Sequence, residues 1–197
     1  LLEVAELICR RMVDRATGCG RNQFDLEWTS IPAIAIRRTW NAERQGQAPA
    51  EPVDTTSYGH NVELAWLLRR AAETAGADLA PYLPVIRALL DRALADGVDW
   101  EYGGVYRDGT AAGGAIIHDK EFWQNAEVLV GLLDGWELFA DSRCLEAFEK
   151  TWAFVRRYMF VEDVGEWRTL LRRDGGAIDP KIGNPWKVAY HTGRAMI

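Results

Sequence analysis

The stretch from Tyr58 to Leu68, Tyr-Gly-His-Asn-Val-Glu-Leu-Ala-Trp-Leu-Leu, decides how the chain is interpreted. Its apolar residues recur with the 3.6-residue period of a helix. On such a helix His60, Glu63 and Trp66 (or Leu67) lie on one face, because residues three and four positions apart are neighbours. A carboxylate one turn from an imidazole can hold the ring in one tautomer. His60 is therefore a candidate general acid or base, with a core histidine as the alternative interpretation.

The chain on either side of this stretch alternates between helical and short β-prone segments. Helices are expected at 1–14, 58–75, 81–96, 120–140 and 143–159, with a further helix beginning near Trp186. Trp100–Arg107 is expected to form a hairpin around Gly103-Gly104, and Glu166–Arg173 a short hairpin strand. The proline-rich residues 31–56 are expected to form a long loop, with one helical turn near residues 34–40.

The order of a helix pair followed by a hairpin recurs with a period of about 60 to 65 residues. His60, Trp123 and Trp186 mark the same point of three successive units, each at a helix start. Helical hairpins that recur in this way predict a toroid, whose inner helices present their N-terminal ends to one cavity. A coincidence of spacing is the alternative.

Composition bounds the class of protein. The 197 residues suffice for one domain with a sizeable core, and the net charge of −6 argues against a nucleic-acid surface. The odd set Cys9, Cys19 and Cys144 fits no zinc spacing and indicates reduced thiols in a cytoplasm. No apolar run approaches the roughly 20 residues of a membrane span, and no signal peptide is visible. Both ends lie in helical patterns, so we expect a piece of a longer protein.

Three groups of residues can carry chemistry. The first is His60 with Glu63 and Trp66. The second is Lys-Glu-Phe-Trp-Gln-Asn-Ala-Glu at 120–127, in which Trp123 and Glu127 are i, i+4 neighbours. The third is Trp-Lys-Val-Ala-Tyr-His-Thr-Gly-Arg at 186–194, which contains a further histidine. Each group alone is equally well interpreted as structural. Their equivalent places in a repeating architecture favour function.

Taken in order, the three groups resemble motifs of the N-acylglucosamine 2-epimerase superfamily, and of cellobiose 2-epimerases in particular. Residues 60–68 resemble Gly-His-Asp-Ile-Glu-Ala-Ser-Trp-Leu-Leu, residues 120–127 resemble Lys-x-Trp-Trp-x-Gln-Ala-Glu, and residues 186–194 resemble Trp-Lys-x-x-Tyr-His-x-x-Arg. The resemblance implies an all-α (α/α)6 barrel about twice the length of this chain, working without metal or other cofactor. Residues 1–197 would then be a single partial barrel domain whose N-terminal half is missing.

The resemblance also implies roles for individual residues. It makes His60 and His191 the two catalytic histidines and Glu63 the carboxylate that orients a histidine. It assigns substrate contacts to Trp66, Trp123, Glu127 and Trp186. The sequence departs from the motifs at Asn61, Phe122 and Asn125, and its loop at 33–54 is longer than the family's connection.

The function that follows is a sugar 2-epimerase acting on the reducing-end aldose of a disaccharide such as cellobiose, through histidine-mediated proton removal and return at C2 by way of a cis-enediol. Proton return to C1 would instead give an aldose–ketose isomerase of mannose type. The expected partner is a small-molecule sugar, with no nucleic acid and no membrane, and an oligomer is possible.

Three other classes of function remain open from the sequence. One is a catalytically silent sugar-binding module on the same scaffold. Another is a glycosidase that uses Glu63 and Glu127. The last is a metal site at His60 with Glu63, or at His118 with Asp119, which the scatter of the three histidines disfavours.

Overall fold

The computed structural model describes residues 1–21, 23–31, 54–179, 181–185 and 187–197. The α-helices within them are α1 (Leu2–Arg11), α2 (Tyr58–Thr74), α3 (Leu83–Arg92), α4 (Phe122–Phe139), α5 (Ser142–Phe154) and α6 (Ala189–Ala195). Single π-helical turns extend α3 and α5, at Ala93–Gly97 and Val155–Met159. The helices expected from the sequence are confirmed, with ends that differ by a few residues.

The strands are short and form antiparallel pairs between the helices. They are β1 (Val13–Asp14), β2 (Cys19–Gly20), β3 (Thr55–Ser57), β4 (Asp108–Thr110), β5 (Ala115–Ile117), β6 (Lys120–Glu121), β7 (Phe160–Val161), β8 (Glu166–Trp167), β9 (Leu170–Leu171) and β10 (Ala177–Asp179). The two three-stranded sheets have the orders β3-β4-β5 and β10-β9-β6. Strands β3 and β6 lead directly into α2 and α4, so the sheets fix where these helices begin.

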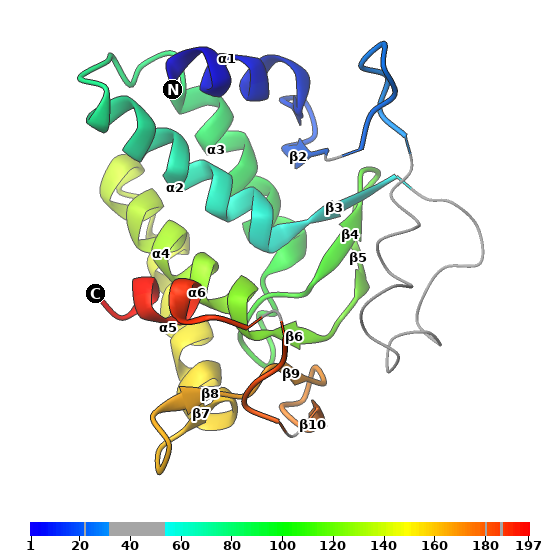
Figure 1. The fold of residues 1–197 in the computed structure, drawn as a ribbon, viewed down its shortest axis with the longest axis vertical. Helices are drawn as coiled ribbons and strands as arrows, with labels where there is room; N and C mark the ends of the chain where they lie inside the picture. Colours follow the sequence, from blue (N-terminus) through cyan, green and yellow to red (C-terminus); the bar gives the residue numbers. More distant parts are fainter. Residues whose placement is uncertain (22, 32–53, 180, 186) are drawn as a thin grey trace.

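Helices α2, α4 and α6 form one layer, and α3 and α5 pack against α2 and α4 respectively (Figure 1). Two glycines allow α2 and α4 to approach each other. A Cβ at Gly59 would lie 2.5 Å from Cγ of Gln124, and a Cβ at Gly131 would lie 2.3 Å from Cγ1 of Val62. Neither distance is sterically possible without a shift of the helices, so both positions require glycine at this spacing.

The hairpin expected at Trp100–Arg107 is present in a reduced form. Gly103 and Gly104 adopt φ values of +84° and +77°, and the backbone pairing around them is a single bridge between Val98 and Val105. A Cβ at Gly103 would lie 2.4 Å from the carbonyl oxygen of Lys150. Glycine is therefore required at Gly103 both by backbone conformation and by space.

The prediction of one hairpin strand over Glu166–Arg173 is wrong, because the segment divides between two sheets. Strand β8 pairs with β7, whereas β9 pairs with β6 and β10. Between them the backbone N–H groups change partner, from the carbonyl of Met159 at Arg168 to the carbonyl of Lys181 at Thr169. The predicted helical turn at 34–40 lies outside the described residues.

Two remaining sequence expectations concern the cysteines and the length of apolar helices. Cys9, Cys19 and Cys144 are buried free thiols. Among the described residues, every helix is too short or too polar to cross a membrane.

Candidate functional site

His60 lies in the first turn of α2 and is held there by the residue that caps the helix. Ser57 is the N-cap, and its Oγ accepts a hydrogen bond from the backbone N–H of His60. The same Oγ lies 3.0 Å from Nδ1 of the His60 ring and accepts a further hydrogen bond from Nε2 of Gln124 at 3.3 Å. The cap therefore fixes the start of α2 and the orientation of the imidazole together.

Trp123 brings the two histidines of the motifs to one place. Its ring centroid lies 4.5 Å from that of His60 and 5.5 Å from that of His191. Trp123 belongs to α4, His60 to α2 and His191 to α6, so the first turns of three adjacent helices meet here. The expectation that the two histidines share one region, without packed core between them, is confirmed.

Glu127 is the centre of the hydrogen bonds in the site. Its carboxylate is almost completely buried, and Oε1 lies 2.6 Å from Nδ1 of His191. Because a buried carboxylate next to a cation accepts rather than donates, Nδ1 of His191 carries the hydrogen and Nε2 keeps a lone pair. Oε2 of Glu127 accepts from the indole N–H of Trp66 at 3.1 Å. Residues of α2 and α6 thus fix a carboxylate that is carried by α4.

Arg194 supplies the positive charge beside this carboxylate. Its Nη2 donates to Oε1 of Glu127 and, at 3.1 Å, to Oε1 of Glu63. Its guanidinium carbon lies 4.5 Å from the ring centroid of Trp66 and 4.0 Å from that of Tyr190. Arg194 therefore bridges the carboxylates of Glu63 and Glu127 and makes cation–π contacts with two aromatic rings.

Desolvation shifts the pKa values of two site residues. It lowers the pKa of His60, an effect that Glu121 opposes and Arg107 reinforces. His60 is thus biased towards the neutral form, although part of the residue is exposed to solvent. Desolvation and the neighbouring Glu127 raise the pKa of Glu63, and His191 and Arg194 oppose that rise.

From the sequence, the Glu63 carboxylate is predicted to reach the His60 ring directly or through one water, and the direct hydrogen bond is not formed. Nδ1 of the His60 ring contacts Ser57 instead, and the Glu63 carboxylate accepts from Arg194. Glu127 does contact a histidine ring, that of His191. The i, i+3 spacing correctly places His60 and Glu63 on one face of α2. Ser57, the N-cap, competes for the imidazole, and Arg194 on α6 competes for the carboxylate.

Other motif residues are placed as follows. Trp66 is buried against Glu127 and Arg194, and Trp186 lies outside the described residues. Lys187 pins the segment before α6, because its Nζ donates to the carbonyls of Trp167 and Ile182 and pairs with Glu166 at 2.9 Å. Lys187 therefore helps to position α6.

Sequence reasoning missed Ser57, Gln124 and Arg194 as parts of the site. A signal existed for two of them. Serine three residues before the histidine is a helix N-cap pattern, and Arg194 ends the third motif. The role of Gln124 depends on the contact between α2 and α4, which has no local signal.

The three departures from the family motifs have structural explanations. Asn61 links β2 to α2: its Oδ1 accepts from the N–H of Gly20, and its Nδ2 donates to Thr56, whose hydroxyl hydrogen is already used on Gly20. An aspartate could not make the second bond in that arrangement. The amide of Asn125 bridges the N–H of Val105 and the carbonyl of Glu121.

Phe122, the third departure, is buried between α4 and the β8–β9 region and faces the edge of His191 with a centroid distance of 6.3 Å. Lys187 lies over its ring at 5.0 Å. An aromatic ring is thus retained where the motif has tryptophan.

Glu63, Glu127 and His191 also form the one cluster of potential metal ligands found in the described residues, with ligand atoms within 4.8 Å of one another. It differs from both pairs considered from the sequence. Arg194 already donates to the two carboxylates, so the cluster has a cation of its own. His118 packs edge-on against Tyr106 instead, with ring centroids 4.8 Å apart.

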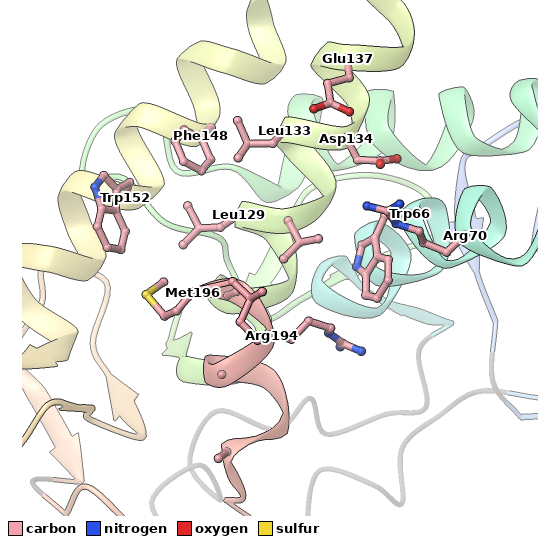
Figure 2. Close-up of a pocket in the computed structure, with 15 residues that line it drawn as sticks. Trp66, Arg70, Leu129, Leu133, Asp134, Glu137, Phe148, Trp152, Arg194 and Met196 are labelled. Atoms are coloured by element: carbon pink, nitrogen blue, oxygen red, sulfur yellow. The ribbon is translucent and has the colours of Figure 1, made fainter. Parts of the chain in front are cut away.

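An open groove of about 1080 Å³ adjoins the site and is walled by α4, α5 and α6. Figure 2 shows Trp66 and Arg194 on one side, with Leu129, Phe148, Trp152 and Met196 along the remainder. The site cluster is therefore reached by solvent from the side of α6, where His191 and Arg194 are each 23% exposed.

The first turns of α2, α4 and α6 thus gather two histidines around an indole, and comparison with known proteins gives the family. Residues 1–195 match the N-acylglucosamine 2-epimerase (GlcNAc 2-epimerase) family, and the chain belongs to it.

Two relatives and one solved structure illustrate the similarity. The chain is 34% identical to a cellobiose 2-epimerase of Bacteroides fragilis over 148 residues, which are 72% of this chain and 36% of that protein. It is 25% identical to a D-mannose isomerase of Marinomonas mediterranea over 134 residues, 68% of this chain and 34% of that protein. The fold superposes on a cellobiose 2-epimerase from Bacillus thermoamylovorans with a TM-score of 0.80 at 24% identity, over 98% of this chain and 44% of the other. The chain thus spans between a third and a half of the proteins it matches.

Proposed function

We propose that the described helices are part of an (α/α)6 barrel that epimerises the reducing-end aldose of a disaccharide such as cellobiose at C2. Residues 1–197 would form one partial barrel domain of the complete enzyme. The observation that carries the proposal is that His60 and His191 both lie against the ring of Trp123. Epimerisation needs two proton-transfer groups that reach opposite faces of one carbon, and we assign these roles to the two histidines.

The reaction starts from the open-chain sugar, whose C1 carbonyl acidifies the hydrogen on C2. Nε2 of His191 takes that proton, the electrons of the C–H bond form the C1=C2 double bond, and O1 gains the negative charge of a cis-enediolate. His60, in its protonated form, returns a proton to the opposite face of C2, and the carbonyl re-forms. In the reverse direction the two histidines exchange roles.

Glu127 contributes by orienting His191 and stabilising the imidazolium that forms, because its carboxylate accepts from Nδ1. This replaces the role that the sequence gave to Glu63. Trp123 offers an indole face to the apolar side of the sugar ring, and Trp66 and Trp186 are proposed to complete the binding surface. The glycosidase alternative is disfavoured because Glu127 is buried and Arg194 ties both carboxylates together.

An aldose–ketose isomerase of mannose type is the second candidate, since a D-mannose isomerase is among the relatives. The two reactions share the enediolate and differ in whether the proton returns to C2 or to C1. A catalytically silent sugar-binding module would keep the tryptophans without needing His191 held by a buried carboxylate.

The test is an assay of the full-length protein with cellobiose, mannose and N-acetylmannosamine in D₂O. Formation of the 2-epimer with deuterium at C2 supports the epimerase. A ketose carrying deuterium at C1 supports the isomerase. Binding of sugar without any product or deuterium incorporation would contradict both and support the silent module.

A further inference from the structure

Arg194 has no role in the mechanism proposed above. It nevertheless contacts four residues of the site, which are Glu63, Glu127, Trp66 and Tyr190. It lies three residues after His191 on α6, so both side chains reach Glu127 from the same face of that helix. Nη1 of Arg194 donates to the hydroxyl of Tyr190, and the guanidinium carbon lies 4.5 Å from the ring centroid of Trp66 and 4.0 Å from that of Tyr190. These contacts fix the position of the charge.

The charges around Arg194 explain why it is needed. Glu63 and Glu127 place two carboxylates within 4.8 Å of each other and of His191. Glu127 has 1% of its side chain exposed and Glu63 has 14%, so water screens their repulsion poorly. The other polar groups on Glu127 are a neutral indole N–H and an imidazole. In this cluster the permanent positive charge is that of Arg194.

We propose that Arg194 is a positioning residue: it keeps Glu63 and Glu127 ionised side by side and thereby keeps Glu127 Oε1 available to the Nδ1 hydrogen of His191. The inference rests on the proposed function for its catalytic consequence. In this role Arg194 neutralises the carboxylates of the site and does not bind the sugar.

Removal of the guanidinium has a defined consequence. One of the two carboxylates must take up a proton or turn away, because two like charges at this separation and burial are costly. Glu63 is the one that protonates, since desolvation and Glu127 already raise its pKa and Arg194 opposes the rise, and its new O–H then competes with the Nδ1 hydrogen of His191 for Glu127. The groups that face this cluster are His191 and Tyr190 from α6 and, more distantly, His60 from α2.

The first test uses stability and needs no sugar. Thermal unfolding of the full-length protein is compared for Arg194→Met, Glu63→Gln and the double variant, with Arg70→Met as control, because Arg70 is an exposed arginine that pairs with Glu73. Arg194→Met should lower the Tm, and adding Glu63→Gln should restore part of the loss, because it removes one of the repelling charges. Additive effects of the two substitutions would overturn the proposal.

The second test reads the histidine directly. The ¹⁵N chemical shifts of the His191 ring, assigned by comparison with His191→Gln, should show Nδ1 protonated in the wild type. In Arg194→Met the ring should become a mixture of tautomers, and Arg194→Lys should retain the wild-type form because it keeps the charge. An unchanged ring signal in Arg194→Met would overturn the proposal.

The third test is kinetic. Arg194→Met should lower kcat about 10- to 100-fold with little change in KM, and should move the acid limb of the pH profile to higher pH. Arg194→Lys should recover part of kcat. A variant with normal kcat and a raised KM would make Arg194 a sugar-binding residue and contradict the proposal. If the wild type turns over no sugar, the proposed function fails, and the stability and ¹⁵N measurements still decide the role of Arg194.

Discussion

Two of the charge clusters in the described residues differ in their balance of charge. In the first, Asp99 accepts from two cations, Lys120 at 3.0 Å and Arg173 at 2.8 Å, and the side chains of Asp99 and Lys120 are 0% exposed. In the second, Glu63 and Glu127 share Arg194, and the fourth member is His191. The first cluster is closed around Asp99 and Lys120, and Glu101 pairs with Arg173 at 2.8 Å to balance its charges, whereas the second is open on one side and ends on an imidazole.

The pKa values follow this difference. Desolvation lowers the pKa of Lys120 to about 8 against the attraction of Asp99. Desolvation would raise the pKa of Asp99, but hydrogen bonds from Arg173 and Lys120 outweigh it and hold that pKa well below the usual range. Asp99 therefore stays ionised throughout the neutral range, Lys120 stays charged below about pH 8, and their pairing ties the 99–104 turn to β6. A buried ion network with saturated contacts is structural, and a charge network that ends on a histidine is suited to proton transfer.

The largest expected effect is a loss of activity when the histidines at or near the second cluster are replaced. In the full-length protein, His60→Ala and His191→Ala should each lower kcat by at least about 10²–10⁴-fold, because water is a poor base for a C–H bond. Trp123→Ala should instead mainly raise KM. Steady-state kinetics with isothermal titration of sugar binding checks this. A histidine variant that keeps its rate but loses affinity would assign that histidine to binding.

The second effect concerns stability. Asp99→Ala leaves Lys120 buried without its carboxylate, and loss of one partner of a buried pair costs about 3–5 kcal/mol in the free energy of unfolding. Glu101→Gln, at the exposed end of the same network, should change it by less than about 0.5 kcal/mol. Urea unfolding of the full-length protein measures both. Equal effects of the two substitutions would remove the distinction between the closed and exposed parts of the first cluster.

A smaller effect tests how the second cluster is held together. Gly131→Ala places a Cβ against Val62 at the contact of α2 with α4, and overpacking of this kind costs about 1–3 kcal/mol. It should also lower kcat, because it separates His60 from Trp123. Gly193→Ala is the matched control, since a Cβ there meets no atom within 4 Å. That control should be neutral or slightly stabilising.

The smallest effect is in the pH dependence. Since desolvation lowers the pKa of His60, its ring stays neutral below the ordinary histidine value of 6.5, and in the reverse reaction, where His60 is the base, the acid limb of kcat/KM should lie below pH 6.5. Glu121→Gln should move that limb to still lower pH, because Glu121 favours the charged ring.

The first cluster responds in a different pH window. The folded-state pKa of Asp99 is depressed, so its contribution to stability is present above the usual value of 3.8 and is lost as the pH falls through the folded-state value. Activity should therefore disappear at a higher pH than the fold. If activity and the circular dichroism signal of the fold were lost at the same pH, this assignment would be contradicted.

The sequence was sufficient to predict the helices and to predict that residues of the different motifs lie close together. The 3.6-residue period located α2 and α4, and the recurrence of helix starts correctly brought His60 and Trp123 together, whereas its third mark, Trp186, lies outside the described residues. A local pattern carries this information, because each residue's face and position on its own helix are set within one or two turns.

The hydrogen-bond partners could not be obtained in the same way. Glu127 meets His191, and Glu63 meets Arg194, across sequence separations that only the packing of α4 and α6 closes. The expected pairing of Glu63 with His60 failed because Ser57, as N-cap, competes for the imidazole. Spacing identifies which residues share a face, whereas the choice among several acceptors depends on burial and charge contributed by other helices.

The central claim is that His60 and His191 transfer the proton at C2, and isotope exchange tests it most directly. The full-length wild type is incubated with cellobiose in D₂O, beside His60→Ala, His191→Ala and the double variant, and deuterium at C2 is followed by mass spectrometry. The wild type should incorporate deuterium from solvent into the 2-epimer, and the double variant should incorporate none above the uncatalysed rate. Exchange at the wild-type rate in the double variant would contradict the assignment of both histidines.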